Sequence, residues 1–99
     1  METNSTVKEK ENTNLKEPSR YSVILHNDDF TTMEFVVLIL TTIFGKTEIE
    51  ANDIMITVHK EGKGVAGIYS FDIAHSKANK ASKKARENGF PLKLTVEKE

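Results

Sequence analysis

Residues 21–45 read YSVILHNDDFTTMEFVVLILTTIFG, in which a short polar turn separates a predicted strand from a predicted helix. The segment Tyr21 to His26 is rich in β-branched and aromatic residues, which favour strands. The apolar run behind the turn predicts a helix over about Thr32 to Phe44. Because this helix is apolar nearly all round, we expect other elements to cover more than one of its sides. The turn therefore holds hydrogen-bonding side chains beside a hydrophobic wall.

Capping patterns mark the ends of two predicted helices. Thr31 followed by Glu34 has the form of a capping box, and Gly45 ends the first helix. Thr47 followed by Glu50 opens the second helix, which we expect to run to about His59. An apolar stripe at the i, i+3, i+4, i+7 spacing predicts its buried face: Ala51, Ile54, Met55 and Val58.

The remaining sequence predicts a strand, a third helix and a last strand. Val65 to Tyr69 favours a strand, and Gly67 within it indicates close approach of another element. The third helix opens at Ser70 or Asp72 and ends at Asn88-Gly89. Leu92 to Val96 alternates apolar and polar residues, as a half-buried strand does. The inner face of the third helix is predicted to consist of small residues with one larger neighbour: Ala74, Ala78, Ala81, Ala85 and Ile73.

The order strand, helix, helix, strand, helix, strand predicts an α+β fold. We expect a two-layer sandwich, with a three-stranded antiparallel sheet and the three helices on one side of it. Residues 20–99 form this core domain. Residues 1–19 contain few apolar side chains and are predicted to be a disordered tail. We expect the protein to be monomeric.

The composition of the chain excludes several classes of function. It has 99 residues, 14 basic and 15 acidic side chains and a formal charge of −1, which gives no long-range attraction to nucleic acid. It has no cysteine, so disulfides and thiolate metal sites are absent. No apolar run approaches the roughly 20 residues that span a bilayer. The N-terminal residues lack the pattern of a signal peptide, so we expect a cytoplasmic protein with no cofactor.

The chemistry of the polar turn has two interpretations. Asn27, Asp28 and Asp29 offer amide and carboxylate acceptors to a ligand, but Asn and Asp also favour turns for their own backbone hydrogen bonds. His59 lies at the margin of the second helix's apolar stripe. Alone, it is interpreted as a helix-terminal His that interacts with the last carbonyls.

Three separated signatures resemble one family. Residues 21–36 have the form Tyr-x-Val-Ile-Leu-x-Asn-Asp-Asp-aromatic-Thr-x-Met-Glu-Phe-Val. Met55 to Gly62 has the form Met-x-x-Val-His followed by Gly, and Ala85 to Leu92 reads Ala-Arg-Glu-Asn-x-x-Pro-Leu. The chain from Arg20 to Glu99 thus resembles ClpS, the adaptor of the bacterial N-end rule.

The resemblance implies a binding function without catalysis. ClpS proteins bind substrates whose first residue is Leu, Phe, Trp or Tyr and deliver them to a AAA+ unfoldase, ClpA or a relative, partnered with the ClpP peptidase. Residues matching those that recognise the free α-amino group are Asn27, Asp28 and His59. The side-chain pocket maps onto Leu25, Thr31, Met33, Val36, Met55, Val58 and Leu92. Docking of the unfoldase N-domain maps onto Asp72 and Lys77.

Other interpretations remain. A general protein-interaction domain of the same fold would lack recognition of N-terminal residues. An acid/base or metal cluster could involve His26, Asp28, Asp29 and His59, although no His-x-x-x-His pair accompanies them. Nucleic-acid binding would rest only on the lysines of the third helix.

Overall fold

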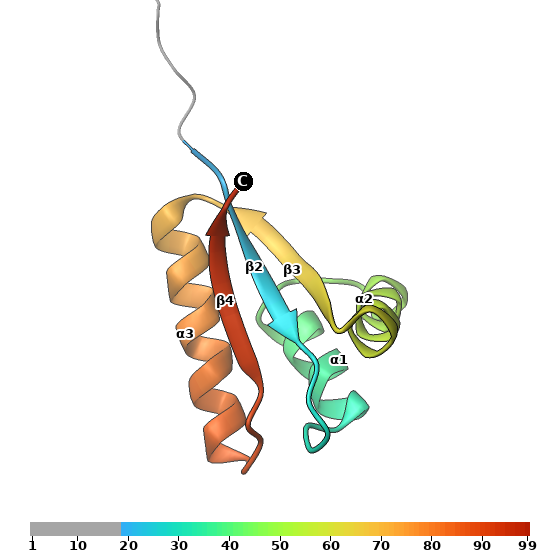
Figure 1. Cartoon of the computed structure of the whole chain (residues 1–99). Coiled ribbons are helices and arrows are strands. Elements are labelled where there is room, and N and C mark those ends of the chain that lie inside the picture. The colour runs from blue at the N-terminus through green and yellow to red at the C-terminus, as the bar shows by residue number, and fades with distance from the viewer. Residues whose placement is uncertain (1–18) are drawn as a thin grey trace, which may run out of the picture.

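The computed structural model describes residues 19–99, so the predicted tail lies outside the described residues except for Ser19. The elements follow in the predicted order. They are β2 (Tyr21–His26), α1 (Met33–Thr42), α2 (Glu48–Glu61), β3 (Lys63–Tyr69), α3 (Phe71–Glu87) and β4 (Lys93–Lys98). Figure 1 shows these elements along the chain.

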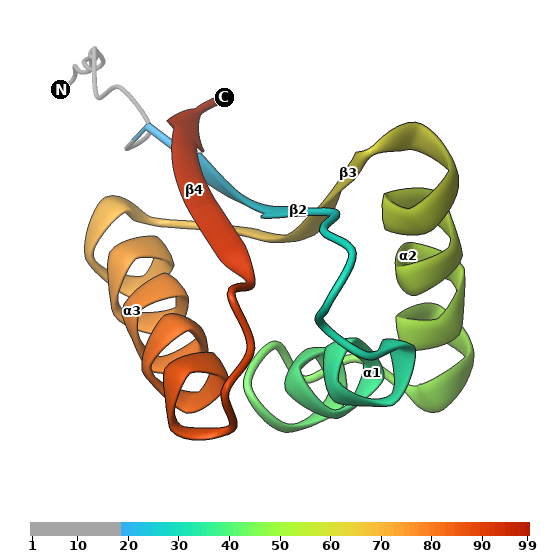
Figure 2. The ribbon, with the colours of Figure 1, turned by 60° about the horizontal axis from the view of Figure 1, so that its bottom comes forward.

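The sheet has the antiparallel order β3-β2-β4, with β2 in the centre. Tyr21 pairs with Tyr69 on one side and with Lys98 on the other, and a register shift interrupts the pairing of β2 with β3 between Val23 and Ile24. The three helices lie on one side of this sheet, and within residues 19–99 no helix or strand covers its other face (Figure 2). The predicted two-layer α+β sandwich is confirmed.

The core lies between the sheet and the helices. Val23 and Leu25 alternate along β2 with residues of the outer face, and both are fully buried. Ile39 and Leu40 of α1 belong to the same core cluster as these two strand residues. The predicted alanine stripe of α3 is buried throughout, which lets this helix lie close to the sheet. Ile73 was expected beside that stripe but is 50% exposed, so it does not belong to the buried face.

The first helix begins one residue later than its capping pattern predicts. Thr32, not Thr31, is the N-cap, and its hydroxyl accepts a hydrogen bond from the Phe35 N–H at 3.2 Å. The predicted Thr31–Glu34 box is therefore wrong, since the Thr31 hydroxyl is engaged elsewhere. The helix packs against α2 and the core, but Leu38 remains 44% exposed.

The connections around α2 follow the prediction. Thr47 and Glu50 form both hydrogen bonds of a capping box, at 2.9 and 3.2 Å. Gly62 ends α2 in the left-handed conformation with φ of 91°, which favours glycine. The group that approaches Gly67 is the phenol ring of Tyr69, which a Cβ there would overlap. Tyr69 belongs to the same strand, so the expected approach of another element is not what the structure shows.

Candidate functional site

A pocket of about 250 Å³ opens where the turn after β2 meets the two helices α1 and α2. We call it the α1–α2 pocket. Val36 and Val58 are buried and form its apolar wall, while Met33 is half exposed. Polar side chains of the turn and of the last turn of α2 surround it. Its lining residues are Asn27, Asp28, Asp29, Thr31, Met33, Val36, Met55, Val58 and His59.

Asp28 organises the turn through its carboxylate. Oδ1 accepts hydrogen bonds from the N–H groups of Phe30 and Thr31 at 2.8 and 2.7 Å, and Oδ2 accepts one from the Thr31 hydroxyl at 2.7 Å. Partial burial opposes the charge on Asp28, but these hydrogen bonds outweigh it, and the pKa of the carboxyl is lowered. The interpretation that Asp28 serves the hydrogen bonds of its own turn therefore accounts for most of its contacts.

Asn27 and Asp29 flank this organising residue and are exposed. The backbone N–H of Asn27 donates to the Gly62 carbonyl at 2.9 Å, which ties the turn to the end of α2. In residues 19–99 no hydrogen bond to the Asp29 carboxylate is found, so its oxygens are available to a ligand. The sequence left Asp29 without a role. The sequence feature that could have indicated a role for Asp29 is its position next to Asp28, because Asp residues favour turns and Asp28 serves that purpose here.

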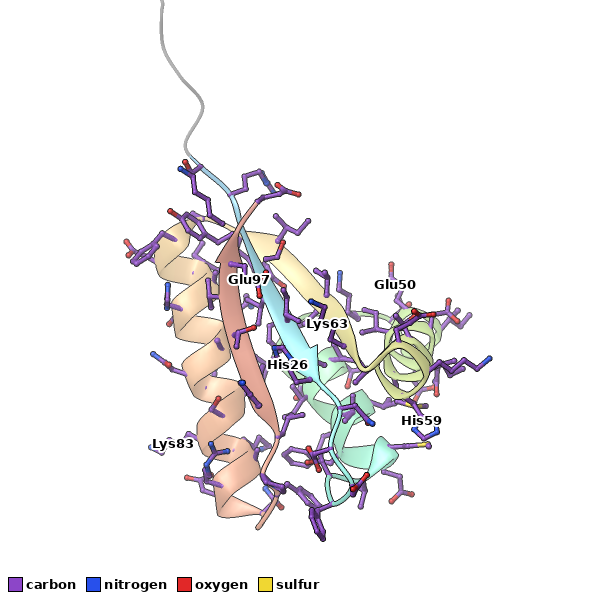
Figure 3. All side chains as sticks on the ribbon, in the orientation of Figure 1. His26, Glu50, His59, Lys63, Lys83 and Glu97 are labelled. Atoms are coloured by element: carbon purple, nitrogen blue, oxygen red, sulfur yellow. The ribbon has the colours of Figure 1, made fainter. Side chains whose placement is uncertain are left out.

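His59 comes to the pocket from the last turn of α2. Its ring projects from the end of the helix toward the side of the pocket (Figure 3). The carbonyl of Val58 is already satisfied by the N–H of Gly62, at 3.0 Å. The alternative that His59 serves the last carbonyls finds no matching hydrogen bond within residues 19–99. The imidazole thus stands exposed beside the turn that carries Asn27.

Two of the predicted pocket residues lie deeper in the molecule. Leu25 is 0% exposed and Leu92 is 1% exposed, and neither is among the residues that line the pocket. Leu25 points into the core because it alternates with His26 along β2. The structure places both leucines in the core cluster, together with Val36 and Val58.

His26 lies apart from the pocket, on the outer face of the sheet. Its Nε2 is 2.8 Å from the Thr95 hydroxyl, and Lys63 and Lys93 are its cross-strand partners. The proposed acid/base cluster is therefore not assembled, since His26 and His59 occupy different surfaces. Among the described residues, no group of three or more His, Asp or Glu side chains could hold a metal ion.

The two predicted docking residues lie on α3, outside the α1–α2 pocket. Asp72 is exposed in the first turn of α3. Lys77 is half-buried, and its ammonium donates to the Ile43 carbonyl at 2.8 Å and lies 5.3 Å from the centre of the Tyr69 ring. Lys77 thus ties α3 to the end of α1.

Comparison with known proteins identifies the family of this chain. The sequence matches the family described as "ATP-dependent Clp protease adaptor protein ClpS" over residues 16–95. The chain belongs to the ClpS family. That membership makes it an adaptor of the ATP-dependent Clp protease. It also confirms the resemblance found in the sequence signatures.

Individual ClpS proteins match over most of the chain. The ClpS adaptor protein of Desulforapulum autotrophicum is 56% identical over 82 residues, which cover 83% of this chain and 79% of that protein. The ClpS of Acetivibrio thermocellus is 50% identical over 99 residues, the full length of both proteins. A solved ClpS structure, Agrobacterium tumefaciens ClpS2 bound to L-phenylalaninamide, superposes with a TM-score of 0.81 at 40% identity. It covers 84% of this chain and 100% of that one. No helix within residues 19–99 is long and apolar enough to cross a membrane.

Proposed function

We propose that this ClpS protein binds proteins whose N-terminal residue is Leu, Phe, Trp or Tyr and delivers them to a ClpA-type AAA+ unfoldase partnered with ClpP. The observation that carries the proposal is the α1–α2 pocket, in which an apolar wall and a ring of acceptors face one small volume. The phenylalaninamide in the related Agrobacterium structure combines a free α-amino group with an aromatic side chain. Such a ligand needs both parts of this pocket.

The polar rim suits the α-ammonium group of a substrate. This group has three donors and a positive charge, and its usual pKa of about 7.7–8.0 keeps it largely charged at neutral pH. Asn27 supplies an amide oxygen, His59 a ring nitrogen, and the two aspartates supply negative charge. Hydrogen bonds to charged groups contribute roughly 1.5–3 kcal/mol each.

The two aspartates divide the work in this proposal. Asp28 already accepts three hydrogen bonds from the turn, so few of its lone pairs remain for a ligand. Asp29 lines the same pocket with its carboxylate exposed. We therefore propose that Asp28 positions the amine site through the turn and contributes much of its negative charge. Asp29 offers the carboxylate that the ammonium group reaches most easily.

The apolar wall receives the first side chain. Val36 and Val58 are fixed by the core, whereas Met33 and Met55 have flexible thioether side chains that adapt to flat or branched groups. Burial of a Leu or Phe side chain contributes roughly 1.5–3 kcal/mol. Thr31 closes the polar side of this wall. Leu25 and Leu92 are buried behind this wall, so they influence the shape of the pocket and do not contact the ligand.

Delivery needs a second surface, and the start of α3 fits that need. Asp72 is exposed there, next to Phe71 and Ile73, which are 53% and 50% exposed. Lys77 holds this end of α3 against α1 through Ile43. We propose that the unfoldase N-domain docks on this surface, with Asp72 as the charged contact.

Fluorescence anisotropy with labelled peptides tests the proposal. Peptides that begin with Phe or Leu should bind, and acetyl-Phe should not, because acetylation removes the positive charge and two donors. Peptides that begin with Ile should bind more weakly, since a β-branched side chain crowds Met33. Equal binding of the free and acetylated Phe peptides would instead favour a general protein-interaction domain.

A further inference from the structure

Phe30 is 75% exposed, although it stands in a turn fixed by hydrogen bonds. A single exposed apolar residue needs no explanation. Phe30, however, lines a groove of about 570 Å³ whose other wall is the loop between α3 and β4. We call it the Phe30 groove. Its remaining lining residues are Arg86, Gly89, Phe90 and Pro91.

The far wall of this groove is held in place by the core. The ring of Phe90 packs on that of Phe35, with 4.7 Å between the ring centres. Gly89 turns the chain with φ of 77°, and the Arg86 guanidinium donates to the Leu92 carbonyl at 3.2 Å. These contacts fix the loop before any ligand arrives. The groove is thus a preformed, largely apolar surface with one cation beside it.

The groove and the α1–α2 pocket share the turn that Asp28 organises. The same Oδ1 atom accepts from the N–H of Phe30 and from that of Thr31. Thr31 lines the pocket, and Phe30 lines the groove. In both ribbon views the link from β2 to α1 lies between α2 and the α3–β4 loop (Figures 1 and 2). One hydrogen-bonded turn therefore separates the pocket from the groove.

We propose that the Phe30 groove receives the side chain of the second residue of a bound substrate and favours an apolar or aromatic one. The inference rests on the proposed function. Successive side chains of an extended peptide point in opposite directions. A peptide that lies over the turn and places its first side chain in the pocket would direct its second toward Phe30. The exposed ring of Phe30 and the half-buried ring of Phe90 offer that side chain apolar contacts on both sides.

Anisotropy titrations with peptides that differ only at the second residue test this inference. The peptides begin Phe-Ala, Phe-Leu, Phe-Phe and Phe-Ser. We expect Leu or Phe at the second position to bind roughly 3- to 10-fold more tightly than Ala or Ser, as partial burial of an apolar side chain implies. Phe30→Ser should abolish this preference and leave the affinity for Phe-Ala within about twofold. Phe30→Tyr, which keeps the ring, should retain the preference.

Ile49→Ser is the matched control, since Ile49 is 77% exposed on α2 and lines neither surface. It should leave all four affinities unchanged. Thermal melts of each variant show whether the turn is still folded. If Phe-Ala binds and the second residue has no effect on affinity, the inference about the groove is wrong while the proposed function stands. If Phe-Ala itself does not bind, the proposed function fails and the inference fails with it.

Discussion

The Thr31 hydroxyl donates a hydrogen bond to the Asp28 carboxylate at 2.7 Å, and the Thr31 N–H donates a second to the same side chain. This double contact closes the turn between β2 and α1. It also settles which threonine caps α1, because Thr31 is engaged and Thr32 is free to accept from Phe35. The polar edge of the α1–α2 pocket is thereby fixed before a ligand binds.

Replacement of each aspartate should separate folding from binding. Asp28→Ala removes three hydrogen bonds from a partly exposed turn and should lower the free energy of unfolding by about 1–2 kcal/mol. Asp29→Ala should change it by less than about 0.5 kcal/mol yet weaken binding of a Phe peptide by about tenfold or more. Urea denaturation and anisotropy measure the two effects. Equal loss of stability in both variants would contradict this division of roles.

Met33→Ala should admit N-terminal Ile and Val. Met33 is half exposed at the pocket, so its truncation removes the group that crowds a β-branched side chain and costs little stability. We expect the affinity for an Ile peptide to rise several-fold relative to that for a Leu peptide, as relief of about 1 kcal/mol of crowding implies. Leu38→Ala is the control, because Leu38 is similarly exposed on α1 but does not line the pocket. An unchanged Ile-to-Leu ratio in Met33→Ala would show that Met33 is not the gate.

Gly64→Ala should displace Val58, which forms part of the pocket wall. A Cβ on Gly64 would lie 2.9 Å from Cγ2 of Val58, which is buried and has little freedom to move. We expect a loss of about 1–3 kcal/mol in unfolding free energy from this overpacking, with weaker binding of Leu and Phe peptides. The losses from Gly64→Ala and Val58→Ala should be less than additive in the double variant, since the smaller wall residue removes the clash. A single variant as stable as the parent would mean that Val58 can move aside.

The stability of the domain should fall as the pH drops below about 6.5, in part through His26. Burial of the ring, followed by the nearby charges of Lys93 and Lys63, lowers the pKa of His26, while Glu97 acts in the opposite direction. Between the lowered pKa and the ordinary value of about 6.5, the unfolded chain binds more protons than the folded one. The contribution is therefore complete above the ordinary pKa and is lost as the pH falls through this window. Lys63→Gln should make the dependence shallower in urea titrations, whereas an unchanged slope would exclude this electrostatic origin.

Local patterns in the sequence predicted most of the fold. β2 occupies Tyr21 to His26 as expected, and the alanine spacing of α3 identified its buried face because small residues allow close packing. The capping box of Thr47 was recognised because both of its partners are local. Thr31 was chosen over Thr32 because nothing in the local pattern shows that Asp28 competes for the first hydroxyl.

The candidate site was less accessible to sequence reasoning. Eight of the ten predicted amine and wall residues lie around one pocket, and most of that assignment came from family resemblance. The prediction that Leu25 and Leu92 line the pocket fails because a sequence signature shows which residues lie near a site but not how deeply each is buried. Asp29 and Phe30 remained without roles, since their significance depends on which side of a three-dimensional turn each one faces.

The backbone N–H of Glu99 donates to the Arg20 carbonyl at 2.8 Å, at the end of the sheet remote from the α1–α2 pocket. β2 runs from that end directly to Asn27, with hydrogen-bonded neighbours along both edges. A force that pulls Arg20 away from a ligand held at the α1–α2 pocket would run parallel to this strand and load both ladders in shear, because their hydrogen bonds lie across the strand. The bonds would share that load instead of opening one after another. We therefore expect the central strand to resist a force that acts between Arg20 and the α1–α2 pocket.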